Sequence, residues 1–372
     1  MANTLTLDEA DAQEHFFEQG WTDGLPVVPP TIDRVQAMLA GGWVEADEII
    51  GAVPERNKEV TAELAAINAV MAGCRPEYFP FVIAGLQAVL DPAFNANAAV
   101  TSTGGAALCT IVSGPGAAAI GMNAKHNAMG SGNRPNATIG RALRLVAANV
   151  LDAKVGKMDG SSFGHPGKYS FCFAEDVPPE GWTTLREDFG YELGDTTVTV
   201  FASEGPRQIA NHLTEDGDEL CRTIASAARL PATFSVGKGC QGVAVIGPEH
   251  RLGMVESGMS KQDVRDRILE LSRIHPDELA AAGVHLEVGA GHPMIPGEDG
   301  LLDTFSSPEA LLVTVAGGHG AGWSSYIAPW APTKHSRITT RRVREEGDSL
   351  PECGPGGCEL PADFFSRLQT KD

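Results

Sequence analysis

Apolar residues recur along the chain with two spacings, and these spacings separate predicted helices from predicted strands. In residues 136–150 they recur every three or four positions, which predicts a helix with one apolar face. Residues 60–71 and 78–90 have the same spacing, and each segment ends before a glycine or a proline. Residues 196–201 alternate like a strand, so we expect a strand there.

Local signals predict further helices and one extended segment. Residues 6–9 and 260–263 have the form of a capping box, in which two side chains satisfy free N–H groups of the first helical turn. They predict helices that end near Gly20 and Ile274. Residues 21–31 contain three prolines and a glycine, which predicts an ordered extended loop. Shorter helices are expected over residues 31–39 and 216–228.

Three runs rich in β-branched residues each stop at a Gly-rich turn. The turns are residues 114–116 (Gly-Pro-Gly), 247–250 (Gly-Pro-Glu-His) and 317–320 (Gly-Gly-His-Gly). A strand that ends in such a turn projects its next residues and its backbone N–H groups from the edge of the sheet, where α/β folds usually bind ligands. If the three turns converge, they form one site.

The repetition of strand, Gly-rich turn and helix predicts an α/β fold made of two related halves. We expect a helical N-terminal segment over residues 1–95 and a first α/β half over residues 96–230. A second α/β half then follows over residues 231–345, and a charged, Gly- and Pro-rich flexible tail over residues 346–372. The alternative is that the strand–glycine turns are those of any α/β protein.

Composition narrows the class of function. The 372 residues carry a net charge of −20, which argues against binding to nucleic acid or to an anionic membrane but not against a small anionic substrate. The chain has no apolar run long enough to span a bilayer, and residues 1–17 lack the basic and apolar regions of a signal peptide, so we expect none there. Its seven scattered cysteines are typical of reduced thiols, so we expect a cytoplasmic protein. Composition leaves a homo-oligomer open.

The loop before the helix at residues 136–150 is a candidate anion site. A Gly-rich loop that leads into a helix N-terminus offers free N–H groups, and Arg134 and Arg141 could pair with a carboxylate or phosphate. Asn123 and Asn136 belong to the same candidate site. The loop matches neither the Walker A nor the GxGxxG pattern, so no nucleotide cofactor is predicted. The alternative is a well-capped helix with surface arginines.

A second candidate lies in residues 161–173, where a Gly-His-Pro-Gly turn precedes a predicted strand. His165 is a candidate base or metal ligand, Lys168 a candidate anion clamp and Tyr169 a candidate proton donor. Further along the chain, Glu249 and His250 follow a predicted strand as an acid–base pair or as metal ligands. The alternative is that these residues only support the fold.

Histidines in Gly-rich turns also raise the question of a metal. His165, His250, His292 and His319 together would suit zinc or another divalent metal. None of them has the HxH or HExxH spacing of a local metal site, so any pairing has to arise in three dimensions. A zinc ion is therefore one hypothesis among several.

Several motifs resemble a widespread bacterial family of hypothetical proteins that are labelled thioredoxin-like or UGSC (seleno)protein-associated. The resemblance covers residues 15–345 and rests on the segments 21–31, 72–78, 136–145, 164–169 and 247–250. It implies thiol or selenol chemistry, and Cys74 beside Arg75 at a helix start is an environment that lowers a thiol pKa. The chain departs from the thioredoxin pattern because it has no CxxC, and it has His319 where similar proteins have a proline.

Together these patterns favour an enzyme that acts on a small anionic organic substrate in a cleft between the two halves. We expect acid–base or metal-assisted hydrolysis or elimination, and hence a hydrolase or lyase. Two alternatives stay open. One is a thiol-dependent oxidoreductase or transferase that uses Cys74 or the Cys353/Cys358 pair, and the other is a non-catalytic protein that binds a ligand or a metal.

The expected site residues form two groups. The candidate catalytic residues are His165, Tyr169, Glu249, His250 and Cys74, and the candidate substrate-binding residues are Arg75, Asn123, Arg134, Asn136, Arg141 and Lys168.

Overall fold

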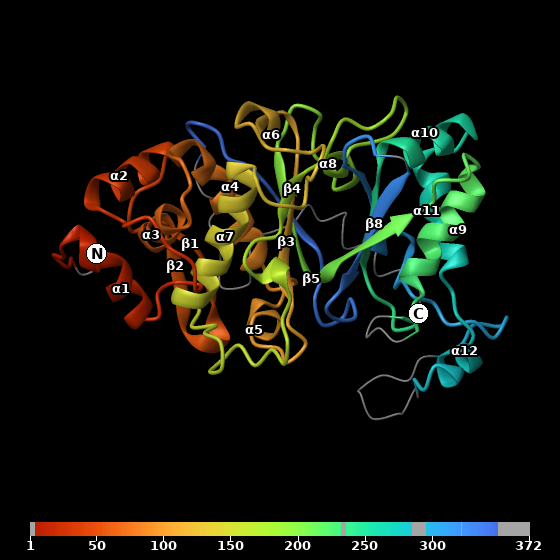
Figure 1. The fold of residues 1–372 in the computed structure, drawn as a ribbon, viewed down its shortest axis with the longest axis horizontal. Helices are drawn as coiled ribbons and strands as arrows, with labels where there is room; N and C mark the ends of the chain where they lie inside the picture. Colours follow the sequence, from red (N-terminus) through yellow and green to blue (C-terminus); the bar gives the residue numbers. More distant parts are fainter. Residues whose placement is uncertain (1–3, 232–235, 285–294, 321, 349–372) are drawn as a thin grey trace.

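The fold is mixed α/β, with one large sheet between two groups of helices (Figure 1). The computed structural model describes residues 4–231, 236–284, 295–320 and 322–348. Within these ranges the sheet has seven strands. They are β3 (Ala107–Ser113), β4 (Cys172–Ala174), β5 (Thr197–Ala210), β6 (Gly242–Ile246), β7 (Leu311–Val315), β8 (Trp323–Pro329) and β9 (Thr339–Arg342).

The strand order is β4-β3-β5-β8-β6-β7, and β9 pairs with β5 beside this path. The two outer pairs, β3 with β4 and β6 with β7, are parallel. The inner pairings of β5 with β3, of β5 with β8 and of β8 with β6 are antiparallel. Strands from both sides of residue 230 therefore belong to one sheet.

The sheet is curled, so that its two end strands meet. Beyond the end of β4, the N–H of Asp176 donates to the carbonyl of Val315 at the end of β7, at 2.8 Å. Side chains that point inward, such as Phe201, Val243 and Ile327, form a core enclosed by the curled sheet. The C-terminal ends of β4 and β7 therefore lie side by side, although these strands are at opposite ends of the strand order.

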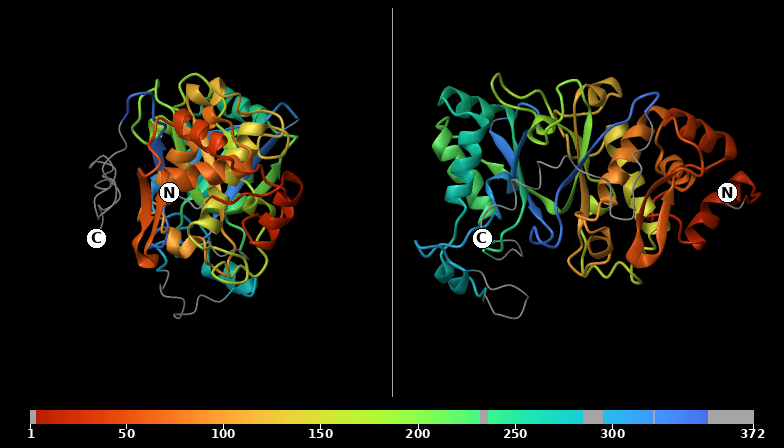
Figure 2. Two further views of the ribbon diagram at one scale, coloured as in Figure 1. Left: turned by 90° about the vertical axis from the view of Figure 1, so that its left-hand side faces the viewer. Right: turned by 180° about the vertical axis from the view of Figure 1, so that it is seen from behind.

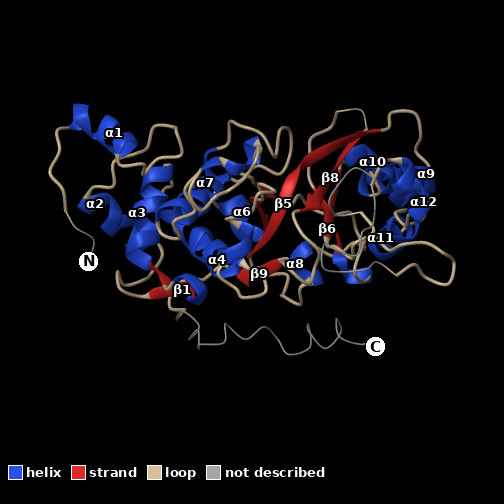
Figure 3. Ribbon diagram, turned by 90° about the horizontal axis from the view of Figure 1, so that it is seen from below, coloured by secondary structure: helices blue, strands red, loops and turns tan. Residues whose placement is uncertain are grey.

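Helices cover the outer face of the sheet as two groups (Figures 1 and 2). One core packs the N-terminal helices and α7 (Arg134–Asn149) against Val198, Val200 and Ala202 of β5. The other packs α9 (Gly217–Ala228) and α11 (Lys261–Leu271) against Ile209 at the far end of the same strand. The long strand β5 thus runs from one group to the other, as Figure 3 shows.

The first group contains α1 (Glu9–Glu18), α2 (Ile32–Gly41), α3 (Ala62–Ala72), α4 (Phe79–Val89), α5 (Ala96–Ala99), α6 (Pro115–Ala119) and α7 (Arg134–Asn149). The second contains α9 (Gly217–Ala228), α10 (Pro248–Glu256), α11 (Lys261–Leu271) and α12 (Pro276–Ala281), while α8 (Leu185–Asp188) lies between them in the chain.

Most of the predicted helices are confirmed, with boundaries that shift by a few residues. Every residue of α4 is buried, which suits a helix that is apolar on all sides. Ser260 and Asp263 form the predicted capping box of α11. The capping box predicted at residues 6–9 is wrong, because α1 begins after Asp8 without a side-chain cap.

Other elements were not predicted from the pattern. The sequence predicts a turn at residues 247–250, but in the structure Pro248 begins α10, because proline is well suited to the first position of a helix. The hairpin of β1 (Ile49–Val53) and β2 (Lys58–Thr61), and the strands β8 and β9, lack the alternation that identifies a strand. The predicted tail lies outside the described residues, apart from residues 346–348. No described helix is both long enough and apolar enough to cross a membrane.

Candidate functional site

The second and third Gly-rich turns meet at the carboxylate of Glu249. Glu249 is the second residue of α10, and its Oε1 accepts a hydrogen bond from the N–H of Gly320 at 3.0 Å. Its Oε2 accepts one from Gly322 at 3.4 Å. The same carboxylate lies 3.3 Å from Nδ1 of His319. One side chain therefore holds both the Gly-rich turn and an imidazole.

The Glu249–His319 pair has the electrostatics of an ionised carboxylate beside an accessible base. Partial burial raises the pKa of Glu249, but the hydrogen bonds from backbone N–H groups and from His319 outweigh it and hold the pKa below its usual value. The side chain of His319 is 83% exposed. With Nδ1 directed to Glu249, Nε2 makes no hydrogen bond to a described residue. An imidazole oriented through one nitrogen can exchange a proton through the other.

A loop from the first half of the chain supports this turn. The N–H of Gly317 donates to the carbonyl of Ala124 at 2.8 Å. Nε2 of His126 donates to the carbonyl of His319 at 3.0 Å. A Cβ on Gly318 would lie 2.2 Å from the ring of His126, so glycine is required where the ring covers the turn. The loop follows the first Gly-rich turn, and its residues contact the third.

His250 lies beside Glu249 in sequence but has a different environment. It is 2% exposed, its Nδ1 lies 2.7 Å from the hydroxyl of Ser324, and its Nε2 donates to the carbonyl of Asn211 at 2.9 Å. Burial lowers the pKa of this imidazole, although the bond to Asn211 opposes that effect. Both ring nitrogens are occupied, so His250 joins α10 to β8 and to the residue after β5.

His165 and Lys168 lie in a separate cluster. Nε2 of His165 donates to the carbonyl of Ser203 at 3.3 Å, and burial lowers the pKa of the ring. The ammonium of Lys168 donates to both carboxylate oxygens of the buried Asp159, at 2.9 and 2.7 Å. Arg144 pairs with the same carboxylate at 2.6 Å. The charges of this cluster are therefore directed largely at one another, while the nearby Tyr169 is 50% exposed.

The structure does not bring His165 and His250 together. His165 contacts Ser203 and His250 contacts Asn211, and the eight steps of largely extended chain from Ser203 to Asn211 span roughly 25 Å. The third expected ligand, His292, lies outside the described residues. Within the part of the chain that the structure describes, no three His, Cys, Asp or Glu side chains are grouped as metal ligands.

The N-terminal candidates are packed against α7. Cys74 is buried, and burial raises the pKa of its thiol to about 12, although a bond from Thr138 and the charges of Arg134 and Arg141 oppose this. Arg75 is exposed and lies 3.7 Å from Glu77. The thiol of Cys74 is therefore protonated near neutral pH.

The two arginines of α7 bind groups of the protein itself. Arg134 donates to the carbonyl of Gly73 at 3.0 and 2.9 Å. Arg141 forms a two-pronged ion pair with Asp23, at 2.8 and 2.7 Å, and also donates to the carbonyl of Pro26. Arg141 therefore fastens the extended loop of residues 21–31 onto α7.

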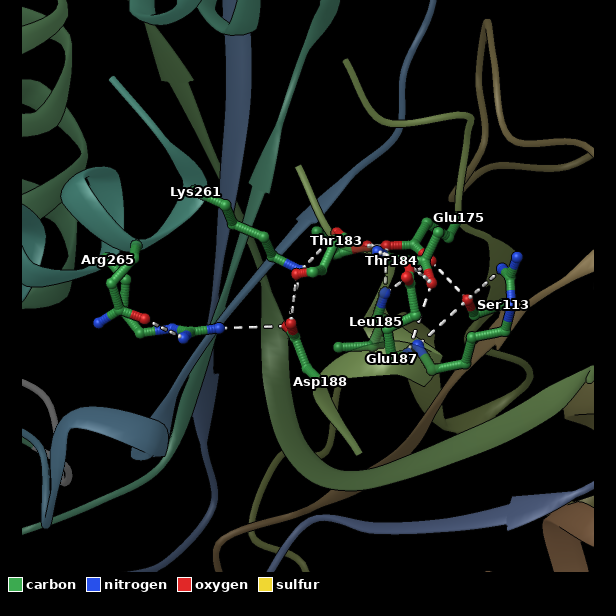
Figure 4. A network of polar contacts seen from close by, with 12 residues as sticks. Ser113, Glu175, Thr183, Thr184, Leu185, Glu187, Asp188, Lys261 and Arg265 are labelled. Carbon is green, nitrogen blue, oxygen red and sulfur yellow. Dashed lines mark hydrogen bonds and ion pairs between the residues drawn. The ribbon is translucent and has the colours of Figure 1, made fainter. Parts of the chain in front are cut away.

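Sequence reasoning missed a buried carboxylate at the junction of the two sheet ends (Figure 4). Glu175 follows β4 and accepts hydrogen bonds from the hydroxyls of Ser113 and Thr314, at 2.5 and 2.8 Å, and from the N–H of Leu185 at 2.9 Å. Burial raises its pKa, although these bonds and the charge of Lys261 oppose the effect. The available signal was its position directly after a strand, which is the logic that identified the Gly-rich turns.

No protein-family model matches this chain, and no curated protein is significantly similar to it. The function is therefore inferred from the site itself.

Proposed function

We propose that the protein is an enzyme, a hydrolase or lyase, that transfers protons on a small anionic organic substrate. His319 serves as the general base and Glu249 as the carboxylate that orients it. The observation that supports this proposal is the 3.3 Å contact between Glu249 Oε1 and His319 Nδ1, with Nε2 making no hydrogen bond to a described residue. An oriented imidazole typically contributes about 10²- to 10⁴-fold to a proton-transfer step.

The chemistry follows from the two protonation states of the pair. Nε2 of His319 removes a proton either from a water that attacks an ester or amide, or from a carbon next to a carboxylate. The imidazolium that forms lies against an ionised Glu249, whose negative charge stabilises it. His319 then returns the proton to the leaving group. The pair fills the acid–base role that the residue pattern predicts for Glu249, His250 and His165.

The preference for an anionic substrate has local support despite the net charge of −20. Lys125 lies between Ala124 and His126, whose contacts hold the Gly-rich turn, and it is exposed. Its ammonium forms no ion pair with a described residue, so it is available to a carboxylate or phosphate. The field at a site is set by the nearest charges rather than by the whole chain.

The thiol alternative has less support at Cys74. A thiol with a pKa of about 12 is a poor nucleophile near neutral pH. Cys353 and Cys358 lie outside the described residues, so the thiol chemistry implied by the UGSC resemblance stays a proposal for that pair. Zinc assistance also stays a proposal, and elemental analysis of wild-type protein beside His319→Ala tests it.

We further propose that the two halves of the sheet are related. Two observations support this. β3 and β6 are each followed by a Gly-Pro turn and a helix that begins at the proline. Each also has a parallel strand on its outer side, β4 or β7, and an antiparallel strand on its inner side, β5 or β8. The pattern of parallel and antiparallel pairing is therefore the same from either end of the sheet, as expected for a duplicated unit.

The test is turnover of a panel of small anionic esters, amides, hydroxy acids and amino acids in D₂O, followed by proton NMR. This format detects hydrolysis, elimination and exchange of a carbon-bound proton in one experiment. We expect His319→Ala to reduce turnover at least ~100-fold. His275→Ala is the matched control, because His275 forms another histidine–carboxylate pair, with Asp277, away from the site.

Two outcomes would reject the proposal. Full activity in His319→Ala would remove this histidine from the reaction. Binding of panel members without any turnover would favour the non-catalytic alternative.

A further inference from the structure

We propose that residues 123–128 form a strap that positions the His319 base, and that Asn136 in α7 holds this strap in place. This inference rests on the proposed function of the Glu249–His319 pair. It concerns residues that the sequence suggested as direct ligands of an anion, and gives them a different role. Asn136 is a positioning residue here, because it acts on the base through the strap.

Asn136 closes the strap at both ends. Its side chain is 2% exposed, and its Oδ1 accepts a hydrogen bond from the N–H of Asn123 at 3.0 Å. Its Nδ2 donates to the carbonyl of Asn123 at 2.8 Å and to the carbonyl of Ala128 at 3.1 Å. One buried amide therefore satisfies three backbone groups. An aspartate could not replace it, because a carboxylate has no N–H to donate to the two carbonyls.

The middle of the strap holds the catalytic turn. Ala124 accepts from the N–H of Gly317 at 2.8 Å, and His126 donates to the carbonyl of His319 at 3.0 Å. The ring of His126 also covers Gly318. Two hydrogen bonds and one close contact therefore fix the backbone on both sides of the Cα atom of His319.

This restraint matters because the His319 side chain is otherwise largely in solvent. An exposed side chain on a Gly-rich turn samples many conformations, and proton transfer needs the imidazole in one of them. Glu249 fixes the ring through Nδ1, while the strap fixes the backbone that carries the ring. The strap belongs to the first half of the chain and the turn to the second. Packing of α7 is thereby linked to the geometry of the base.

Hydrogen exchange of the Gly317 amide tests the proposal without any substrate. We expect Asn136→Ala to speed its exchange at least ~10-fold, since a released strap no longer accepts this hydrogen bond. Asn149→Ala is the matched control, because Asn149 lies in the same helix and donates to Trp21 and Asn68, away from the strap. Unchanged exchange at Gly317 in a folded Asn136→Ala protein would overturn the proposal.

A second pair of variants guards against misfolding of Asn136→Ala. His126 is exposed, so His126→Ala should fold, yet it should loosen the turn and broaden the imidazole NMR signals of His319. His126→Gln should restore sharp signals, because a glutamine amide can donate to the His319 carbonyl. Equal spectra for both variants would also overturn the proposal. Since neither measurement uses turnover, failure of the strap and failure of the proposed reaction can be told apart.

Discussion

The hydroxyl of Thr314 on β7 donates a hydrogen bond to Glu175, the residue after β4, at 2.8 Å. These two strands are the ends of the sheet order, so this bond lies where the curled sheet closes. Ser113 of β3 donates to the same carboxylate. A single buried carboxylate therefore joins three strands close to the Gly-rich turns.

Glu175→Gln should change how stability depends on pH. Burial raises the pKa of Glu175 in the folded protein, so its contribution to stability is fully present below the unfolded pKa and is lost as pH rises through the folded value. Glutamine keeps the shape without the charge. The free energy of unfolding of the variant, relative to wild type, should therefore increase from pH 4 to pH 7 in urea titrations.

Glu187→Gln provides a contrast of opposite sign. Hydrogen bonds from Thr184 lower the pKa of Glu187, so its contribution is present above the unfolded pKa and is lost as pH falls through the folded value. The free energy of unfolding of this variant, relative to wild type, should decrease slightly from pH 3 to pH 7. If the free energy of unfolding relative to wild type changed with pH in the same direction for both variants, the environment assigned to Glu175 would be wrong.

Arg141→Ala should destabilise the protein rather than abolish substrate binding. The side chains of Arg141 and Asp23, which form an ion pair, are 15% and 10% exposed. Loss of the arginine therefore leaves a poorly solvated carboxylate at Asp23. We expect a loss of about 3 kcal/mol in the free energy of unfolding. Under conditions where the variant is still folded, its KM for a substrate found in the panel should equal that of the wild type. A rise in KM without loss of stability would return Arg141 to the substrate site.

Cys74 should react slowly with thiol reagents in the native state. Burial raises the pKa of the Cys74 thiol to about 12, so very little of it is ionised at pH 7, and the side chain is also buried. Mass spectrometry after brief iodoacetamide treatment should find the Cys74 peptide unlabelled in native protein and labelled in urea. Rapid native labelling at pH 7 would restore the thiol-dependent alternative.

Glu249→Ala should loosen the Gly-rich turn as well as reduce turnover. The change leaves the N–H groups of Gly320 and Gly322 without their acceptor, which we expect to cost about 1–3 kcal/mol in the free energy of unfolding. Glu249→Gln keeps an acceptor oxygen, so it should lose less stability while still losing most of the activity. Urea unfolding and turnover measured on both variants separate the two effects.

Short-range signals in the sequence are enough to predict many of the helices and strands. Apolar spacing identified α4 and α7, and the Ser260–Asp263 capping box identified the start of α11, because both signals act over a few neighbouring residues. The strands before the Gly-rich turns were recognisable for the same reason. β8 was not, since residues 323–329 include two serines and have neither a polar–apolar alternation nor a run of β-branched residues.

Which of the candidate catalytic and binding side chains contact one another depends on the tertiary fold. Glu249 and His250 are adjacent, but successive helical residues point about 100° apart, so one faces His319 and the other Ser324. Arg141 looks like an anion clamp in the sequence, yet its partner is Asp23, 118 residues away. Such pairings depend on how the sheet curls and where the helices pack. The spacing of residues along the chain predicts neither, because both arise from contacts between distant segments.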